Sequence, residues 1–167
     1  MELKFRALTE EEIDVRVQSV KTNGAILLLY KDARCDMAIL DETVGPLRWQ
    51  RKHSRENANC TVSIYDTDLK EWISKEDTGT ESNTEAEKGL ASDSFKRACF
   101  NWGIGRELYT APFVWIPSDK CNINNGKCYD KFHVEKIKVE NKKIIGLAIW
   151  NDTKNVRAFV WQPTQKG

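Results

Sequence analysis

Hydrophobic and polar residues alternate along the first part of the chain, as they do in a half-buried β-strand. Ile13 to Val17 is apolar at every second position, and a continuous apolar run from Ala25 to Tyr30 follows it. The Asn23-Gly24 dipeptide between them favours a tight turn, because both residue types tolerate the backbone angles that such turns require. The pattern therefore predicts a β-hairpin.

A helical period follows the hairpin. Apolar residues recur at spacings of three and four, at Ala33, Met37, Leu40 and Val44. Asp32 is placed to cap the first turn, and Gly45-Pro46 is a stop signal. We expect a one-sided helix packed on a sheet.

A second group of strands is predicted from Arg48 to Ser54 and from Cys60 to Tyr65, continuing past a turn into Glu71 to Ile73. Alternate residues of a strand share a face. Arg48, Gln50 and Lys52 should therefore lie on one face, and Trp49, Arg51 and His53 on the other. One face of this strand is expected to be wet and cationic.

The next helix is predicted at about residues 85–102, opened by a capping box of Thr84 and Glu87 and ended by Gly103. One side of this helix carries Ala91, Phe95, Ala98 and Trp102. The opposite side carries Asp93, Lys96, Arg97 and Phe100. Lys96 and Arg97 should thus face away from the core, Trp102 and Tyr109 should be core residues, and Phe100 should pack under the C-terminal strands or against a neighbouring subunit.

Three further strand-like stretches end the chain, at Phe132 to Val139, Ile144 to Trp150 and Val156 to Trp161. They predict an added antiparallel meander. The whole is expected to be α+β: a β-β-β-α core of antiparallel sheet packed by two main helices, with the meander as an extension. We expect the core to span 1–119 and the extension 120–167, packed as one domain.

Positive and negative residues nearly balance in number but are unevenly distributed along the chain. The chain has 167 residues with 26 Lys and Arg against 25 Asp and Glu. Four cations and no acid lie between Arg48 and Arg55, whereas Glu71 to Asp93 is strongly acidic. No apolar run approaches the length that spans a bilayer, and the N-terminal residues lack an apolar signal core. We expect a cytoplasmic protein.

Two candidate chemistries are weak. Cys121, Cys128 and His133 are too widely spaced for an ordinary zinc site and lack a fourth ligand, so two free thiols are the simpler interpretation. Asp68 and Lys70, with Asp41 or Asp66, are similar to the centre of metal-dependent nucleases, but such triplets are common in a charged chain. No catalytic residue, metal or cofactor is predicted.

Two separated blocks resemble a known family. The stretch from Glu87 to Ala98, continuing from Trp102 to Tyr109, looks like the signature helix of the Rad-fifty-two-like single-strand annealing proteins, which include phage-encoded members. The block from Leu29 to Gly45, followed by Trp49, resembles the strand, helix, Gly and Trp block of that family. The resemblance covers roughly residues 12–116, and the C-terminal meander has no counterpart.

The resemblance implies a homo-oligomer, as a ring or open helix, whose groove holds single-stranded DNA during recombination or repair, alongside recombination partner proteins. The family's basic pair falls on Lys96 and Arg97, and the arginine that opens its earlier helix falls on Arg34. A further basic residue of the family falls near Phe100, and Arg106 is the candidate to replace it. We expect three further cations to add to the positive electrostatic potential that attracts DNA, namely Arg48, Arg51 and Lys52.

Annealing of this kind needs no nucleotide, because cations that hold phosphates can leave the bases free to pair. Two alternatives stay open from the sequence. The first is a DNA-binding accessory protein without annealing activity. The second, less favoured, is a metal-dependent nuclease that uses Asp68 and Lys70.

Overall fold

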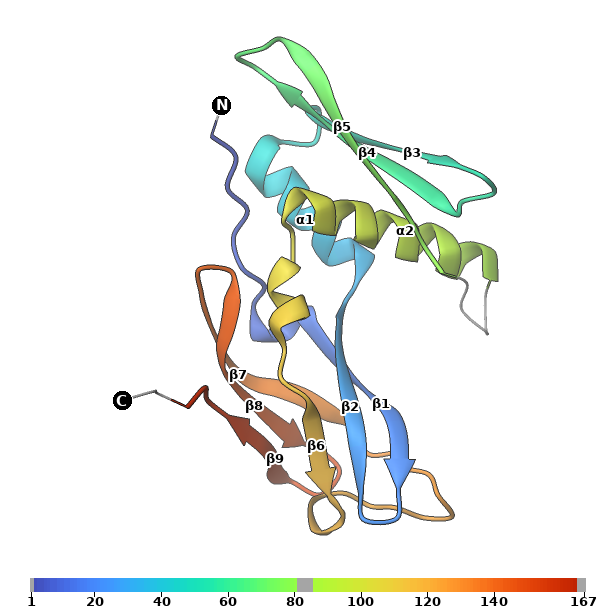
Figure 1. Ribbon diagram of the computed structural model, residues 1–167, viewed down its shortest axis with the longest axis vertical. Coiled ribbons are helices and arrows are strands. Elements are labelled where there is room, and N and C mark those ends of the chain that lie inside the picture. The colour runs from blue at the N-terminus through green and yellow to red at the C-terminus, as the bar shows by residue number, and fades with distance from the viewer. Residues whose placement is uncertain (1, 81–85, 165–167) are drawn as a thin grey trace. The chain divides into compact units, whose positions relative to one another are not determined.

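The structure, a computed structural model, describes residues 2–80 and 86–164. These residues contain two α-helices and three antiparallel sheets of three strands each. The predicted α+β class is therefore confirmed. The elements are β1 (Ile13–Lys21), β2 (Gly24–Lys31), α1 (Ala33–Val44), β3 (Trp49–Ser54), β4 (Asn59–Asp66), β5 (Glu71–Thr78), α2 (Ala86–Trp102), β6 (Val114–Pro117), β7 (Phe132–Glu140), β8 (Lys143–Asn151) and β9 (Val156–Trp161) (Figure 1). Short 3-10 helices span Glu10–Glu12, Arg106–Thr110 and Ser118–Lys120.

The chain divides into two compact units, which we describe separately. The first unit comprises residues 1–6 and 31–106, and the second comprises residues 7–30 and 107–167. These bounds differ from the division at 119/120 expected from the sequence. The difference arises because β1, β2 and β6 pair in one sheet and belong to the same unit as the C-terminal strands.

Helix α1 of the first unit begins and ends at the predicted signals. The Asp32 carboxylate accepts a hydrogen bond from the backbone N–H of Arg34 at 2.7 Å, which satisfies a donor that the first turn leaves unpaired. Gly45 ends the helix at a φ of 87°, an angle that costs glycine little. Ile39 and Leu40 are fully buried. The predicted one-sided helix is confirmed.

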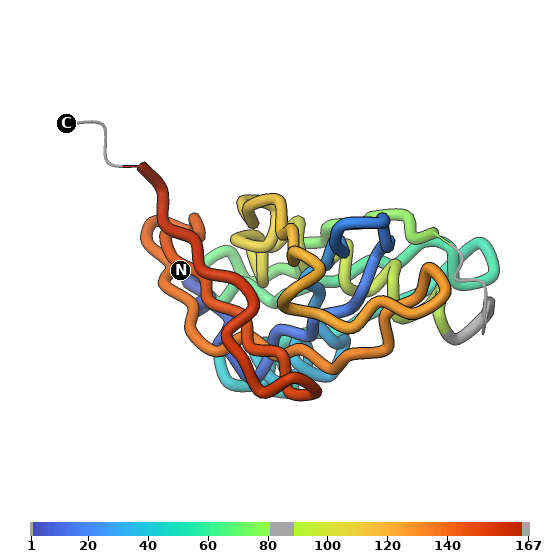
Figure 2. The backbone as a smooth tube through the Cα atoms, turned by 90° about the horizontal axis from the view of Figure 1, so that it is seen from below, coloured from blue at the N-terminus to red at the C-terminus, as the bar shows by residue number. Residues whose placement is uncertain are grey.

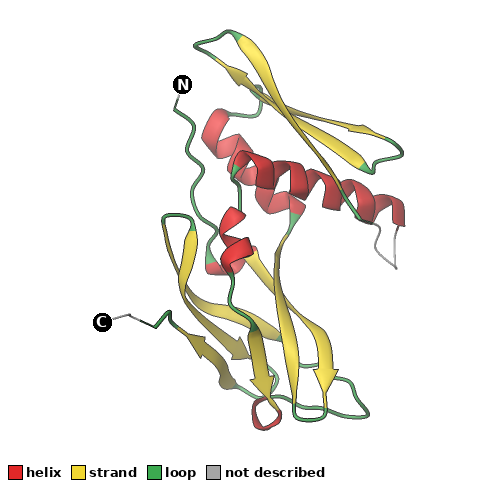
Figure 3. Ribbon diagram, in the orientation of Figure 1, coloured by secondary structure: helices red, strands yellow, loops and turns green. Residues whose placement is uncertain are grey.

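The sheet β3–β4–β5 carries both helices on one side (Figure 3). Cys60, Val62 and Ile64 of β4 are buried beneath α2, which buries Phe95 and Ala98 in return. Gly79, directly after β5, allows α2 to approach closely, because a Cβ there would lie 2.6 Å from the Ser94 backbone nitrogen.

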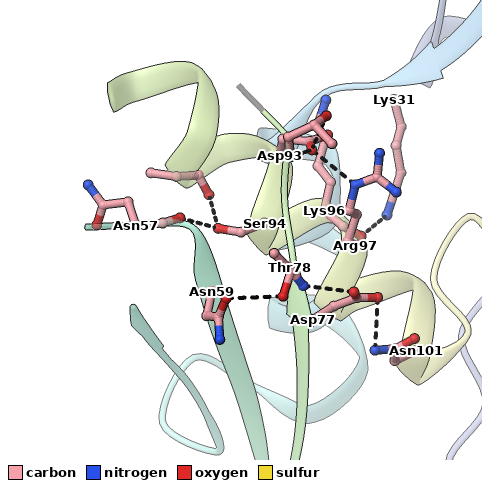
Figure 4. Close-up of polar contacts among 12 residues, drawn as sticks. Lys31, Asn57, Asn59, Asp77, Thr78, Asp93, Ser94, Lys96, Arg97 and Asn101 are labelled. Carbon is pink, nitrogen blue, oxygen red and sulfur yellow. Dashed lines mark hydrogen bonds and ion pairs between the residues drawn. The ribbon is translucent and has the colours of Figure 1, made fainter. Parts of the chain in front are cut away.

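Side-chain contacts from α2 cover part of the β5 edge. The Asn101 side chain donates to the Glu76 carbonyl at 3.1 Å and to the Asp77 carboxylate at 3.2 Å (Figure 4). The other Asp77 carboxylate oxygen accepts from the Thr78 N–H at 2.7 Å. Two backbone groups near the end of β5 are therefore already occupied. The outer edge of β3 carries no such cap among the described residues.

The second unit contains the sheets β1–β2–β6 and β7–β8–β9. The predicted hairpin and C-terminal meander are both confirmed, and the strands of the meander lie side by side in Figures 1 and 2. Gly24 is paired with Pro117 on β6, and a Cβ at this position would collide with the Trp115 ring. Ile144, Leu147 and Ile149 of β8 are buried.

Tyr109 is 66% exposed, so its assignment to the core was wrong. Trp102 is half-buried and donates its indole N–H to the Val62 carbonyl at 2.9 Å. The capping box of Thr84 and Glu87 lies outside the residues whose side chains the structure describes. No helix in ranges 2–80 and 86–164 has the length and apolar character needed to cross a bilayer.

Candidate nucleic-acid interface

Two of the cations predicted for DNA binding lie on α2. Lys96 and Arg97 are both half-exposed, whereas the neighbouring Phe95, Ala98 and Cys99 are fully buried. The predicted orientation of the basic pair away from the core is therefore confirmed. Because the helix is held by its buried side, the two cations have a fixed position on the first unit.

Arg97 is engaged by an acid one turn earlier. Its Nε donates to the Asp93 carboxylate at 3.0 Å, with the two side chains 40% and 27% exposed (Figure 4). Asp93 also accepts from the Thr80 N–H at 2.7 Å. Burial alone would raise the pKa of Asp93, but these hydrogen bonds and the nearby cations hold it below its ordinary value. Arg97 thus shares its charge with a carboxylate at neutral pH, while the Lys96 side chain has no hydrogen-bond partner within the described ranges.

A buried lysine anchors the C-terminal half of α2. Lys31 is 1% exposed, and its Nζ donates to Asp36 of α1 at 2.5 Å. The same Nζ also donates to the backbone carbonyl of Lys96 at 3.3 Å (Figure 4) and to that of Ile104 at 3.1 Å. These contacts use all three donors of the ammonium group. Lys31 therefore ties α1 to the segment that carries the basic pair.

Sequence reasoning missed this ion pair. Lys31 ends an apolar strand, where a lysine is ordinarily solvated. The usable signal was Asp36, which lies one turn before Leu40 and therefore on the buried side of α1. A carboxylate on that side requires a buried partner.

The Asp36 carboxylate is only partly satisfied. Its Oδ2 is buried and has no hydrogen-bond partner in the described part of the chain. Burial raises the pKa of Asp36 to about 6, against the opposing attraction of the Lys31 ammonium. Burying this pair therefore costs electrostatic free energy, which other interactions in the first unit must offset.

Phe100 has a role that the sequence did not indicate. Its ring lies 3.9 Å from the Lys31 Nζ, close enough for a cation–π contact. The ring thus makes a contact inside the first unit, and packing of its half-exposed side against another subunit stays a prediction. An aromatic on the half-exposed side of α2 helps to shield the buried ammonium.

Arg34 and Arg48 are both exposed on the first unit. Arg34 is the second residue of α1, and its side chain has no partner among residues 2–80 and 86–164. It does not pair with Asp36 or Asp41, because Asp36 binds Lys31 and Asp41 accepts the Trp49 indole N–H at 2.6 Å. Arg34 is thus available to a ligand.

Arg51 and Lys52 lie on opposite faces of β3, as the alternation predicted. The Arg51 guanidinium lies 4.5 Å from the centre of the Phe95 ring, on the side that α2 covers. Trp49 stacks on the same ring at 6.0 Å. Lys52 is exposed on the opposite side. The structure therefore divides this cationic cluster between two faces of the sheet.

Arg106 is exposed but already makes contacts of its own. Its guanidinium donates to the Phe100 carbonyl at 2.9 and 3.0 Å and to the Asn101 carbonyl at 2.8 Å. A cation at the C-terminal end of a helix is favoured by the helix dipole and satisfies carbonyls that lack partners. Arg106 is therefore a cap for α2, and this role accounts for it without a DNA contact.

The two alternative chemistries find little support in the geometry. Asp66 accepts hydrogen bonds from the N–H groups of Asp68 and Leu69 in the β4–β5 turn, and these bonds lower the pKa of Asp66. His133 pairs with Asp152 at 2.9 Å. Across residues 2–80 and 86–164, no three Asp, Glu, His or Cys side chains are grouped closely enough to hold a metal ion. This applies to the nuclease candidate and to Cys121, Cys128 and His133.

Comparison of the chain with protein-family models, with curated proteins and with solved structures found no match.

Proposed function

We propose that this protein binds single-stranded DNA and anneals complementary strands without a nucleotide, acting in recombination or repair as a homo-oligomer. The observation that carries the proposal is the basic pair on α2. Lys96 and Arg97 project from a helix that is held from behind by buried apolar residues and by the Lys31 anchor. Fixed cations of this kind suit the phosphate backbone, whose contacts give affinity without sequence preference.

The arrangement of the first unit also supports the proposal. Its order is α1, then three antiparallel strands, then α2 packed across them. This order is the β-β-β-α core that the family resemblance implies. Arg34 and Arg48 add exposed cations from the same unit.

A physical route to annealing follows from binding through phosphates. Each phosphate contact releases counterions, so affinity for a single strand should fall by about 0.7 log units per log unit of salt for each contact. A strand held by its backbone keeps its base edges accessible, in contrast to a strand whose bases stack on aromatic side chains. A second strand can then test its pairing on the protein surface.

The test compares two charge-matched double variants. K96Q/R97Q should weaken binding of a labelled dT oligonucleotide by about tenfold or more, since two phosphate contacts are lost. R55Q/K70Q removes one arginine and one lysine from exposed turns of the same unit and should change affinity less than about twofold. Equal losses in both variants would refute the assignment of the site to α2.

The function itself is tested by the rate at which two labelled complementary oligonucleotides anneal, with excess chelator and no nucleotide. Acceleration that K96Q/R97Q abolishes is the expected result. Binding without acceleration would leave the DNA-binding accessory protein as the better description. Strand cleavage that requires Mg²⁺ and is lost in Asp68→Ala would instead establish the nuclease.

A further inference from the structure

The C-terminal sheet has a groove on one face. The groove has a volume of about 730 Å³ and runs over β7, β8 and β9, with the segment after β9 along one side. Gly146 and Ala148 of β8 form part of its floor. Two small residues in the central strand leave room above the sheet that larger side chains would fill.

One wall of the groove is cationic. Lys136 and Lys138 are two residues apart on β7 and are paired with Ala148 and Gly146. Both lysines are exposed and line the groove. Neither side chain has an ion-pair partner among residues 2–80 and 86–164. An anionic ligand would therefore meet two ammonium groups without an ion-pair partner in that part of the chain, although Lys136 also attracts the neighbouring Glu135 carboxylate.

The other charged groups at the groove are already in use. Arg157 forms an ion pair with Glu135 at 2.6 Å. Glu10 accepts a hydrogen bond from the Ile137 N–H at 3.1 Å. The Glu10 carboxylate also lines the groove, so the cationic character of this wall depends on Lys136 and Lys138.

The opposite wall is apolar. Val160 of β9 is paired with Ala148 and is 61% exposed, and Pro163 lies beyond the end of the strand. A single strand of nucleic acid has this same division, with charged phosphates on one side and apolar base faces on the other. An acidic peptide would also match the lysines, so poly-glutamate is the competing ligand in the test.

We propose that this groove is a second binding site for single-stranded DNA, with Lys136 and Lys138 on the phosphates and Val160 beside the bases. The proposal rests on the proposed function, because it takes the same polymer as ligand. It gives the C-terminal sheet, which has no counterpart in the family that residues 12–116 resemble, a direct part in holding a strand.

The experiment uses the full chain and a labelled dT oligonucleotide. K136A/K138A should weaken binding at least about fivefold and reduce the salt dependence by about 1.4 log units per log unit of salt, from two lost contacts. The control K142A/K143A removes two exposed lysines at the β7–β8 turn that do not line the groove, and should change affinity less than about twofold. Equal losses in the two variants would overturn the proposal.

A second measurement uses the protein without substitutions, so its result does not depend on whether a variant folds. Chemical acetylation followed by mass spectrometry should show Lys136 and Lys138 protected by the oligonucleotide, with Lys142 and Lys143 still reactive. Absence of this protection would overturn the proposal, as would tighter binding of poly-glutamate than of an oligonucleotide of equal charge.

The two proposed sites fail in different ways. If only K96Q/R97Q weakens binding, the α2 site stands and the groove is refuted. If only K136A/K138A weakens binding, the groove stands and the assignment to α2 is refuted. If the unmodified chain binds no single-stranded DNA, both proposals fail together.

Discussion

Lys31 and Asp36 form a buried ion pair in which the ammonium and carboxylate atoms lie 2.5 Å apart and neither side chain is more than 1% exposed. The pair joins the end of β2 to α1, and through two carbonyls it also holds the C-terminal part of α2. Taking two charges out of water is costly, so the value of such a pair depends on every donor having a partner.

Removing one member of this pair should destabilise the protein strongly. Lys31→Met leaves Asp36 buried without its partner, and we expect a loss of about 3–5 kcal/mol in the free energy of unfolding. The double variant K31M/D36L should lose less than the sum of the single variants, because it leaves no uncompensated charge. Urea unfolding of the unsubstituted protein, of Lys31→Met, of Asp36→Leu and of the double variant gives the coupling energy.

The exposed pair of Arg6 and Glu42 is the matched control for this cycle. Their side chains are 38% and 47% exposed, and their contact is 2.9 Å. Its coupling energy should be about 0–1 kcal/mol, since solvent screens exposed charges. Comparable coupling energies in the two cycles would contradict the importance given to Lys31.

The raised pKa of Asp36 predicts the direction of a pH effect. The folded protein holds the proton up to about pH 6, while the unfolded chain releases it near the ordinary aspartate pKa of 3.8. Between these values the folded state binds more protons, so the contribution of Asp36 to stability falls as pH rises from about 4 to about 6. Unfolding measured across this range should show the decrease, and Asp36→Asn should remove it. A contribution that increases with pH would contradict this account.

The two members of the basic pair should not contribute equally to DNA binding. Arg97 already binds Asp93, whereas the Lys96 side chain has no hydrogen-bond partner in ranges 2–80 and 86–164. Lys96→Gln should therefore weaken binding more than Arg97→Gln. Asp93→Asn should strengthen binding about two- to threefold at low salt, since it releases Arg97 and removes a negative charge. Fluorescence anisotropy of the three variants provides the comparison, and a weaker Asp93→Asn complex would argue against DNA contact by Arg97.

Arg106 should matter for stability more than for DNA binding. Arg106→Ala removes the contacts to the carbonyls of Phe100 and Asn101, and we expect a loss of about 1 kcal/mol in the free energy of unfolding. Affinity for single-stranded DNA should change much less than in Lys96→Gln. A large loss of affinity with unchanged stability would instead restore Arg106 as a DNA contact.

The thiols should differ in reactivity. Cys35, Cys60, Cys99 and Cys121 are buried, and only Cys128 is half-exposed. Burial raises the pKa of Cys60 and Cys121 to about 11, which reduces the thiolate that reacts with a disulfide reagent. One thiol per chain should react quickly in the folded protein, and Cys128→Ser should abolish this fast phase. Fast reaction of a second thiol would contradict the burial of the other four.

Local signals in the sequence predicted most of the elements of the fold. The Asn23-Gly24 turn, the Asp32 cap and the Gly45 stop each act within a few residues, so their effects can be recognised without tertiary structure. The alternation along β3 also separated Arg51 from Lys52 correctly. These features depend on periods of two and 3.6 residues, which the chain displays directly.

The candidate site was less accessible to such reasoning. The partners of Lys31 come from α1, α2 and the segment after α2, and no local pattern brings these three segments together. The same is true of Phe100, whose ring on the half-exposed side of α2 contacts the Lys31 ammonium. The grouping of strands into units also depends on pairing between β2 and β6, which lie far apart in the sequence.

The contacts of Asn101 and Asp77 along β5 constrain the symmetry of any assembly built through this sheet. With backbone groups of Glu76 and Thr78 occupied, strand addition is hindered at β5, while β3 keeps its outer edge in the part of the chain that the structure describes. Two copies joined β3 to β3 would be related by a two-fold axis, and that contact would use both open edges. A ring or filament requires two different complementary surfaces, so pairing of the β3 edge with itself cannot build one.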